Sequence, residues 1–272
     1  MSVITISRQL ASLGTEIAQA VAETLHYEYV DKEKIAGALA DYGLPALEIE
    51  RFDEKKPPFW DSLQFQRWKF IHFIQAMIYD FASKGNVVLV GRGGQVLLKD
   101  LPGVLHVRVI APFDVRVRRI MKQGGKDERQ AAEILRRSDR DSSGFIRSFF
   151  DMDWDDSDFY DLVLNTQKFT ADTGVKMILE SIHSLEVKES EKKAGEKLAD
   201  LALSQKVEVA LLDILGTDIR YIKVKVERGT VILKGAVTSD IYKENCQRAA
   251  AKIPGVNRVD NQLSVSPDYK YA

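Results

Sequence analysis

The sequence predicts an α/β fold with a parallel sheet flanked by helices, followed by a small α+β domain. Short, almost continuous apolar runs such as "NVVLVGRGG" (86–94) are typical of parallel strands that are buried on both faces. Segments with apolar residues at helical spacing alternate with these runs, which is the order expected of a sheet with helices packed on it. Beyond residue 197 the pattern changes to a helix, two alternating strands, a helix and a last strand.

The first part of the chain begins with a short strand, "SVITIS" (2–7), which leads into a predicted helix at 14–27. Ile17, Val21 and Leu25 recur at helical spacing there and predict one apolar face. Strands and helices then follow in alternation. The further predicted strands are 86–94, 103–112 and 160–166, and the further predicted helices are 67–85 and 112–125.

A charged segment separates the two predicted domains. Residues 186–197, "EVKESEKKAGEK", have no large apolar residue after Val187 and indicate a linker or the start of an exposed helix. A helical pattern, two strands joined at Arg228-Gly229, a second helix and a closing strand follow, which is enough for a small independent domain. We therefore predict domains at 1–185 and 198–266, with 186–197 as a charged linker.

Composition narrows the choice of partners. The chain has 39 Lys and Arg residues against 40 Asp and Glu residues, so no global charge favours nucleic acid or an anionic membrane. The only cysteine, Cys246, excludes an internal disulfide and disfavours a cysteine-rich metal site. The first residues show no secretory pattern, and no apolar run approaches the roughly 20 residues of a bilayer span. We expect a cytoplasmic protein that binds no nucleic acid, and membrane binding is disfavoured.

The junction between the first strand and the first helix has the position of a phosphate loop. Such a loop binds an anion through successive backbone N–H groups and a helix N-terminus, usually in the pattern GxxxxGK[ST]. Aligned on the helix, Arg8 stands at the first glycine, Leu13 at the second, Gly14 at the lysine and Thr15 at the metal-binding hydroxyl. The sequence therefore does not match the motif, and the alternative is a plain helix N-terminus capped by Ser12 or Thr15.

Three ordered stretches resemble the cytidylate kinase-like family. They are "ISRQLASLGTEIAQAVAETLHYEYVDKEKI", "VVLVGRGGQVLLKDLPGVLHVRVIAPFDVRVRRIMK" and "EILRRSDRDSSGFIRSFFDMDWDDSDFYDLVLNT", so the resemblance covers about residues 1–183. The family loop reads roughly S-R-Q-x-G-S-G-G and itself lacks the lysine. The resemblance implies a P-loop-type, nucleotide kinase-like fold, ATP and Mg²⁺ as cofactors, and a nucleotide or another small phosphorylated molecule as partner.

The resemblance also implies which residues form the phosphate site. Arg8, Ser12, Gly14 and Thr15 would bind phosphate, and the Thr15 hydroxyl would also bind the metal ion. Arg8 follows a strand end, where its charge can replace that of the missing lysine; the alternative is a surface ion pair.

Arginines elsewhere in the domain match the family's catalytic groups. Arginine suits phosphoryl transfer because it stays ionised and offers a planar fork of donors. Arg92 follows a buried strand among glycines, which we expect to leave it open, and it would bind the acceptor and take part in catalysis. Arg137 and Arg140 fall in the family's mobile lid and would approach phosphates, although such clusters are usually solvated helix faces. Asp139 would contact the substrate base or pair with an arginine.

The chain departs from the family at two loop positions and from true cytidylate kinases at two positions around the turn after a predicted strand. Two loop glycines of the family are Ala11 and Leu13 here. Glycine allows positive φ and close approach to a phosphate, and a leucine makes both difficult. Val90 and Gly93 stand where cytidylate kinases carry carboxylates, which affects metal and acceptor binding.

Other charged segments have simpler interpretations. We interpret Arg116, Arg118 and Arg119 as helix-surface charges, with Arg116 at a position that can also face the site. The stretch "DMDWDDSDFYD" (151–161) lacks the spacing of a calcium loop and is interpreted as an acidic loop that pairs with the lid arginines.

The C-terminal segment resembles the BON domain over about residues 198–266. Gly229 lies at the strand turn, Gly235 after the second strand, and Gly255 at the helix end. BON domains are associated with phospholipid or envelope interactions and with small-molecule sensing. The resemblance implies a sensing or protein-interaction module with an unknown ligand.

Together these features favour a nucleotide-binding, kinase-like protein that phosphorylates CMP or a related small acceptor with ATP. The alternative is a catalytically impaired nucleotide-binding regulatory protein, or a scaffold, that acts through the BON domain. A kinase for a different small acceptor remains a further option.

Overall fold

The computed structural model describes residues 2–41, 64–99 and 101–266. The chain divides into two compact units. The first consists of Met1–Trp60 and Lys84–Ala194, and the second of Asp61–Ser83 and Gly195–Ala272. Within the described residues, no helix combines the length and the apolar character that crossing a bilayer requires.

The first unit is built on a five-stranded, fully parallel sheet, which confirms the predicted fold class. Continuous apolar side chains allow its central strands to be buried on both faces. The order across the sheet is β2-β3-β1-β4-β5. The strands are β1 (Val3–Arg8), β2 (Glu28–Val30), β3 (Val87–Val90), β4 (Val104–Ile110) and β5 (Leu162–Asn165).

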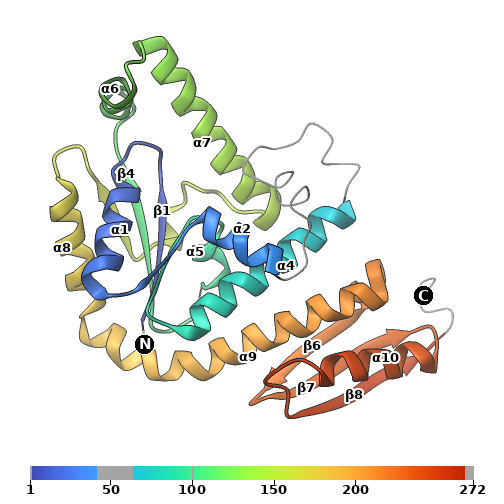
Figure 1. Ribbon diagram of the computed structural model, residues 1–272. Helices are drawn as coiled ribbons and strands as arrows, with labels where there is room; N and C mark the ends of the chain where they lie inside the picture. Colours follow the sequence, from blue (N-terminus) through green and yellow to red (C-terminus); the bar gives the residue numbers. More distant parts are fainter. Residues whose placement is uncertain (1, 42–63, 100, 267–272) are drawn as a thin grey trace. The chain divides into compact units, whose positions relative to one another are not determined.

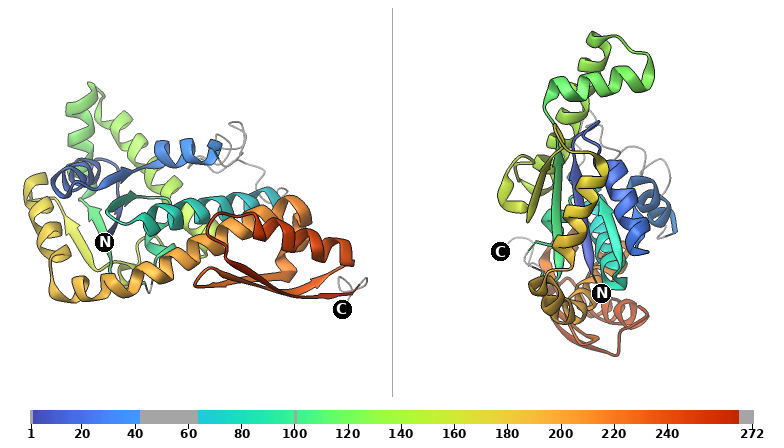
Figure 2. Two further views of the ribbon diagram at one scale, coloured as in Figure 1. Left: turned by 60° about the horizontal axis from the view of Figure 1, so that its bottom comes forward. Right: turned by 90° about the vertical axis from the view of Figure 1, so that its left-hand side faces the viewer.

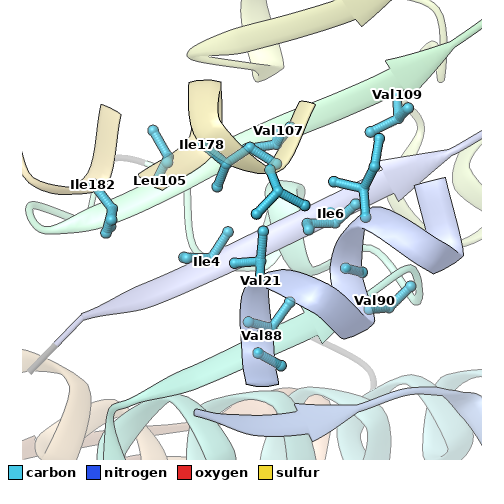
Figure 3. Packing of buried hydrophobic residues seen from close by; sticks show 14 of the residues in the cluster. Ile4, Ile6, Val21, Val88, Val90, Leu105, Val107, Val109, Ile178 and Ile182 are labelled. Carbon is cyan, nitrogen blue, oxygen red and sulfur yellow. The ribbon is translucent and has the colours of Figure 1, made fainter. Parts of the chain in front are cut away.

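The main core of this unit lies between the sheet and two helices, α1 (Gly14–Leu25) and α8 (Ala171–Ile182). The apolar face predicted for α1 is buried: Ile17 and Val21 have no exposed surface. Figure 3 shows Val21 of α1 and Ile178 of α8 over the apolar side chains of the central strands. This packing holds the first strand–helix junction rigidly against the sheet.

The remaining helices of this unit surround the sheet. Figures 1 and 2 show α6 and α7 extending past the carboxyl ends of β1 and β4, where the family's lid is expected. A capping box begins α7: the Asp127 carboxylate accepts from the Gln130 backbone, and the Gln130 side chain accepts from the Asp127 backbone. The elements are α2 (Lys32–Asp41), α5 (Gly94–Leu97), α6 (Phe113–Gly124), α7 (Glu128–Phe150) and the 3₁₀ turn η2 (Ser157–Phe159).

The strand order decides where a ligand can bind. β1 lies between β3 and β4, and the chain leaves β1 towards one side of the sheet before returning to the other. At such a switch point the connections diverge and leave a crevice beyond the carboxyl ends of the strands. Arg8 at the end of β1 and Gly91 just after β3 lie at this edge.

The second unit contains a three-stranded sheet and two long helices. Its sheet order is β6-β7-β8. Strands β6 and β7 are antiparallel, and β7 and β8 are parallel and are connected along the chain by a helix. The predicted α-β-β-α-β order is therefore confirmed. The elements are α4 (Gln64–Lys84), the part of α9 (Leu185–Leu215) from Gly195 onward, η3 (Gly216–Tyr221), β6 (Ile222–Glu227), β7 (Thr230–Val237), α10 (Asp240–Ala251) and β8 (Arg258–Val265).

Local backbone geometry explains the glycines of this unit. Arg228 and Gly229 both have positive φ, 49° and 75°, as a two-residue hairpin turn requires. At Gly235 a β-carbon would lie 2.0 Å from the carbonyl oxygen of Tyr221, so only glycine fits.

Burial raises the pKa of the Cys246 thiol to about 11, which keeps this sulfur protonated and unreactive at neutral pH.

Two segments can be compared with the sequence-based domain map. The charged residues 186–197 lie within α9, as the second of the two interpretations expected. Most of α4, which the sequence places in the first domain, groups with the second unit. Polar contacts link this helix to α9: Asp80 forms an ion pair with Lys206, and His72 Nδ1 lies 3.1 Å from a Glu208 carboxylate oxygen.

Candidate phosphate-binding site

The loop between β1 and α1 adopts backbone angles that glycine normally provides. Ala11 has φ 60°, and Leu13 has φ 66° and ψ 12°, so both are left-handed despite their β-carbons. Leu13 is the N-cap of α1, and no side chain caps this helix end. The first N–H groups of α1 are therefore not used by a capping side chain and point out of the helix end. The replacement of the family glycines does not prevent the glycine conformation.

The loop is held in place by one of its own side chains and by two side chains from other parts of the domain. The Ser12 hydroxyl donates to the carbonyl oxygens of Gln9 and Val109, and the Thr166 hydroxyl donates to the carbonyl of Ser12. Arg119 donates to the carbonyls of Ala11 and Thr166. Ser12 is fully buried, so its hydroxyl shapes the loop from within the protein.

The left-handed angle at Ala11 gives a direct test of loop strain. Ala11→Gly should raise the free energy of unfolding by about 0.5–1 kcal/mol, because glycine adopts positive φ without the steric cost of a β-carbon. Ala20→Gly in the interior of α1 should lower it by about 1 kcal/mol. Denaturant unfolding measures both, and a loss of stability in Ala11→Gly would contradict the assigned loop conformation.

Arg8 and Gly14 are in close contact across the loop. A β-carbon on Gly14 would lie 2.4 Å from the Arg8 β-carbon and 2.9 Å from its γ-carbon. The Arg8 side chain then runs towards the end of β3, where its Nη1 atom would lie 3.0 Å from a β-carbon on Gly91. Thr15 is an exposed residue in the first turn of α1. The structure thus brings Arg8, Gly14 and Thr15 together at one edge of the sheet.

The turn after β3 carries three successive residues with positive φ. These are Gly91 (77°), Arg92 (54°) and Gly93 (76°). The expectation that glycine neighbours leave Arg92 open is wrong: Arg92 is only 8% exposed, and its guanidinium carbon lies 5.5 Å from the centre of the Phe145 ring. A β-carbon on Gly93 would lie 2.3 Å from the Phe150 ring. The end of α7 therefore covers the turn.

Arg8 and Arg92 line one small cavity. Its volume is about 20 Å³, enough for a single water molecule and far below that of a nucleotide. Aromatic side chains from the end of α7 and the acidic loop close it. The other lining residues are Ser7, Gly91, Gly93, Gln95, Ser142, Phe145, Ile146 and Trp154. A nucleotide requires this aromatic cover to move away from the strand ends.

The predicted lid arginines do not join this cavity. Arg137 and Arg140 are exposed on α7, and Arg137 lies 3.9 Å from Asp141 in an ion pair. With about 100° of rotation per residue, Arg140 is about 160° around the helix from Ser142, which lines the cavity. In this conformation Arg140 therefore lies on the side of α7 away from Arg92.

Asp139 pairs with Arg116, which supports one of its two expected roles. Both terminal guanidinium nitrogens of Arg116, Nη1 and Nη2, donate to the Asp139 carboxylate, at 2.9 and 2.8 Å. Two of the three α6 arginines are not surface charges as expected: Arg116 is 3% exposed, and Arg119 donates to the loop. Burial lowers the pKa of Arg119, and the Glu16 carboxylate partly offsets this effect. Arg118 is exposed and pairs with Asp114.

The acidic loop is held by an arginine that the sequence did not single out. Arg108 of β4, rather than a lid arginine, pairs with Asp155 and donates to the carbonyl of Trp154. Its guanidinium stacks 4.5 Å from the Trp154 ring. The Trp154 indole donates to the Ser7 hydroxyl at 2.9 Å, beside Arg8. A charged residue inside the apolar run "VLHVRVI" was the available sign of this role.

The comparisons with known proteins agree with this geometry. A family model described as the cytidylate kinase-like family matches residues 3–168, more than half of the chain, and the BON domain model matches residues 199–267. The cytidylate kinase of Methanothermobacter thermautotrophicus is 28% identical over 171 residues, which cover 62% of this chain and 98% of that protein. The cytidylate kinase of Archaeoglobus fulgidus is 29% identical over 191 residues, which cover 70% and 99%.

Two further matches give weaker evidence about this chain. A uronate isomerase of Corynebacterium glutamicum is 35% identical over 104 residues, but the match spans 38% of this chain and only 20% of that protein. The solved structure of an uncharacterized protein from Eubacterium ventriosum has a TM-score of 0.54 and 22% identity, covers 68% of this chain and 99% of its own, and shows the fold alone. On the family model, the chain belongs to the cytidylate kinase-like family and carries a BON domain after its kinase-like part.

Proposed function

We propose that this nucleotide kinase-like protein binds ATP with Mg²⁺ and phosphorylates CMP or a related small acceptor, with its BON domain as a sensing or interaction module. The loop from Arg8 to Thr15 carries the proposal. Its backbone takes the left-handed angles at Ala11 and Leu13 although neither residue is glycine. Strain of this kind persists only where the surrounding structure imposes it, and such positions cluster at ligand sites.

Two charges support the same assignment. Arg8 and Arg92 come from the ends of neighbouring strands and line one cavity at the switch point of the sheet. Phosphoryl transfer depends on positioning and on cations around the moving group, so two guanidinium groups at this edge suit it. The relatives named as cytidylate kinases make CMP the first acceptor to test.

The residues present fit a nucleotide phosphate better than a free metal ion. Among the described residues there is no group of three His, Cys, Asp or Glu side chains that would hold a metal. Thr15 offers one exposed hydroxyl beside the N-terminus of α1. Mg²⁺ usually keeps several water ligands and binds together with substrate phosphates. Mg²⁺ would therefore arrive with ATP and take Thr15 as its protein ligand.

A second function is favoured by the covered acceptor turn. Phe150 packs where a side chain at position 93 would begin, and Arg137 and Arg140 point into solvent. A protein that binds nucleotide but does not transfer phosphate would tolerate these features. It would act as a regulator or scaffold through the BON domain.

Calorimetric titration of the full chain with ATP, ADP, CMP and dCMP, with and without Mg²⁺, separates these functions. The kinase assignment expects binding of ATP and of one monophosphate, and production of ADP that depends on the monophosphate. Binding without ADP production would establish the regulatory alternative. If no nucleotide binds at millimolar concentration, both assignments fail and the kinase-like part is a scaffold.

A further inference from the structure

We infer that Arg8 and Gly14 are a reciprocal exchange of the glycine and lysine of an ordinary phosphate loop, so that Arg8 supplies the phosphate-binding charge from the opposite side of the loop. This inference rests on the proposed nucleotide binding and names the residue that makes it possible without a lysine. In GxxxxGK[ST] the first position is glycine and the seventh is lysine. Here the first is Arg8 and the seventh is Gly14.

The geometry explains why both positions change together. A β-carbon on Gly14 would lie 2.4 Å from the β-carbon of Arg8, and real β-carbons do not approach other atoms so closely. At most one of the two positions can therefore carry a side chain in this backbone. A chain with arginine at position 8 needs glycine at position 14, and a lysine at position 14 needs glycine at position 8.

The direction of the Arg8 side chain shows where its guanidinium group lies. Its β- and γ-carbons cover Gly14 at the N-terminus of α1, where the lysine side chain would begin. Its Nη1 atom reaches the backbone of Gly91, next to Arg92. The stem of the side chain thus lies at the helix end, which suits the phosphates of the donor, and its guanidinium lies at the turn after β3, where the acceptor is proposed. Its planar fork can bind phosphate oxygens in a bidentate manner, a geometry that the ammonium group of a lysine does not offer.

Position 14 requires glycine only because the Arg8 side chain leaves no space for a β-carbon there. Gly14 does not have a positive φ, so an L-residue suffers no backbone strain there. Once the Arg8 side chain is removed, the nearest remaining neighbour of a β-carbon is Val109, at 3.2 Å, which a shift of a few tenths of an ångström relieves. The double variant Arg8→Gly, Gly14→Lys should therefore be accommodated, although Gly14→Lys alone should not.

A double-mutant cycle tests the exchange. Arg8→Gly should weaken the binding of ATP with Mg²⁺ by about 10- to 100-fold, the effect of losing one or two charge-assisted contacts. Gly14→Lys alone should lower the melting temperature because of the collision with Arg8. The double variant should regain most of the melting temperature and bind ATP at least about fivefold more tightly than Arg8→Gly, a difference of about 1 kcal/mol.

Arg8→Ala serves as a second variant if glycine at the end of β1 prevents folding, and Arg147→Ala, an exposed arginine of α7, is the matched control for loss of charge. Unchanged ATP binding in Arg8→Ala, or a double variant that melts no higher than Gly14→Lys, overturns the exchange. The melting temperatures need no ligand, so they test it separately from the proposed function. A wild-type protein that binds no ATP would instead overturn the proposed function.

Discussion

Arg92→Ala should weaken the binding of CMP by about 10- to 100-fold, because one or two charge-assisted contacts to a phosphate contribute about 1.5–3 kcal/mol. Arg92→Lys should recover only part of this loss, since an ammonium group lacks the planar fork of donors. Arg92→Ala should also lower the free energy of unfolding. Arg92 is 8% exposed and stacks near the Phe145 ring, and the loss of a cation–π contact of this kind costs about 0.5–2 kcal/mol. Calorimetry and thermal unfolding measure the two effects.

Arg147→Ala provides the comparison for Arg92→Ala, because Arg147 is an exposed arginine of α7, the helix whose end covers Arg92. It should change neither CMP binding nor the melting temperature measurably. If Arg92→Ala and wild type bind CMP equally well, Arg92 does not contact the acceptor. The covered turn after β3 would then serve only the fold.

Removal of the Asp139 carboxylate should destabilise the first unit by about 2–4 kcal/mol. Asp139→Ala leaves Arg116 buried, with 4% of its side chain exposed, and without its bidentate partner. Breaking a buried pair from one side costs about 3–5 kcal/mol, and partial exposure of Asp139, 28% of its side chain, reduces that value. The melting temperature of the full chain measures the loss.

Asp141→Ala is a closely matched control for Asp139→Ala. Asp141 belongs to the same helix and has 27% of its side chain exposed, but its partner is the exposed Arg137 at 3.9 Å. Its loss should cost less than about 1 kcal/mol, as for other surface pairs. Equal effects of the two substitutions would show that the Arg116 pair is not important for stability. A loss of nucleotide binding in Asp139→Asn without a loss of stability would favour the other role, contact with the substrate base.

The fold could be predicted from periodicity because its elements carry their own pattern. Apolar runs such as 86–94 predict strands buried on both faces, and Val87–Val90 form the second strand from one edge and are fully apolar. The spacing of Ile17 and Val21 predicted the buried face of α1. The second sheet followed from alternation and from the turn at Arg228-Gly229. Each of these depends on residues that are near one another in sequence.

The contacts of the charged side chains could not be predicted in the same way. Asp155 pairs with Arg108, 47 residues away, and Arg119 donates to Ala11, 108 residues away. Several arginines were available to the acidic loop, and the position of Arg108 inside an apolar strand marks it as unusual without naming its partner. The choice depends on which strand ends and helix faces the sheet order brings together.

The sequence by itself determined the α/β core, the αββαβ domain, the position of the loop at the first strand–helix junction and the candidates Arg8 and Arg92. Only the tertiary structure decided that Ala11 and Leu13 hold glycine-like angles, that Arg8 excludes a side chain at Gly14, and that Phe145 and Phe150 cover Arg92 and Gly93. Periodicity reports which face of an element is buried, since it reflects local spacing along the chain. Backbone strain and close contact depend on atoms from distant segments, so they appear only when those segments are packed together.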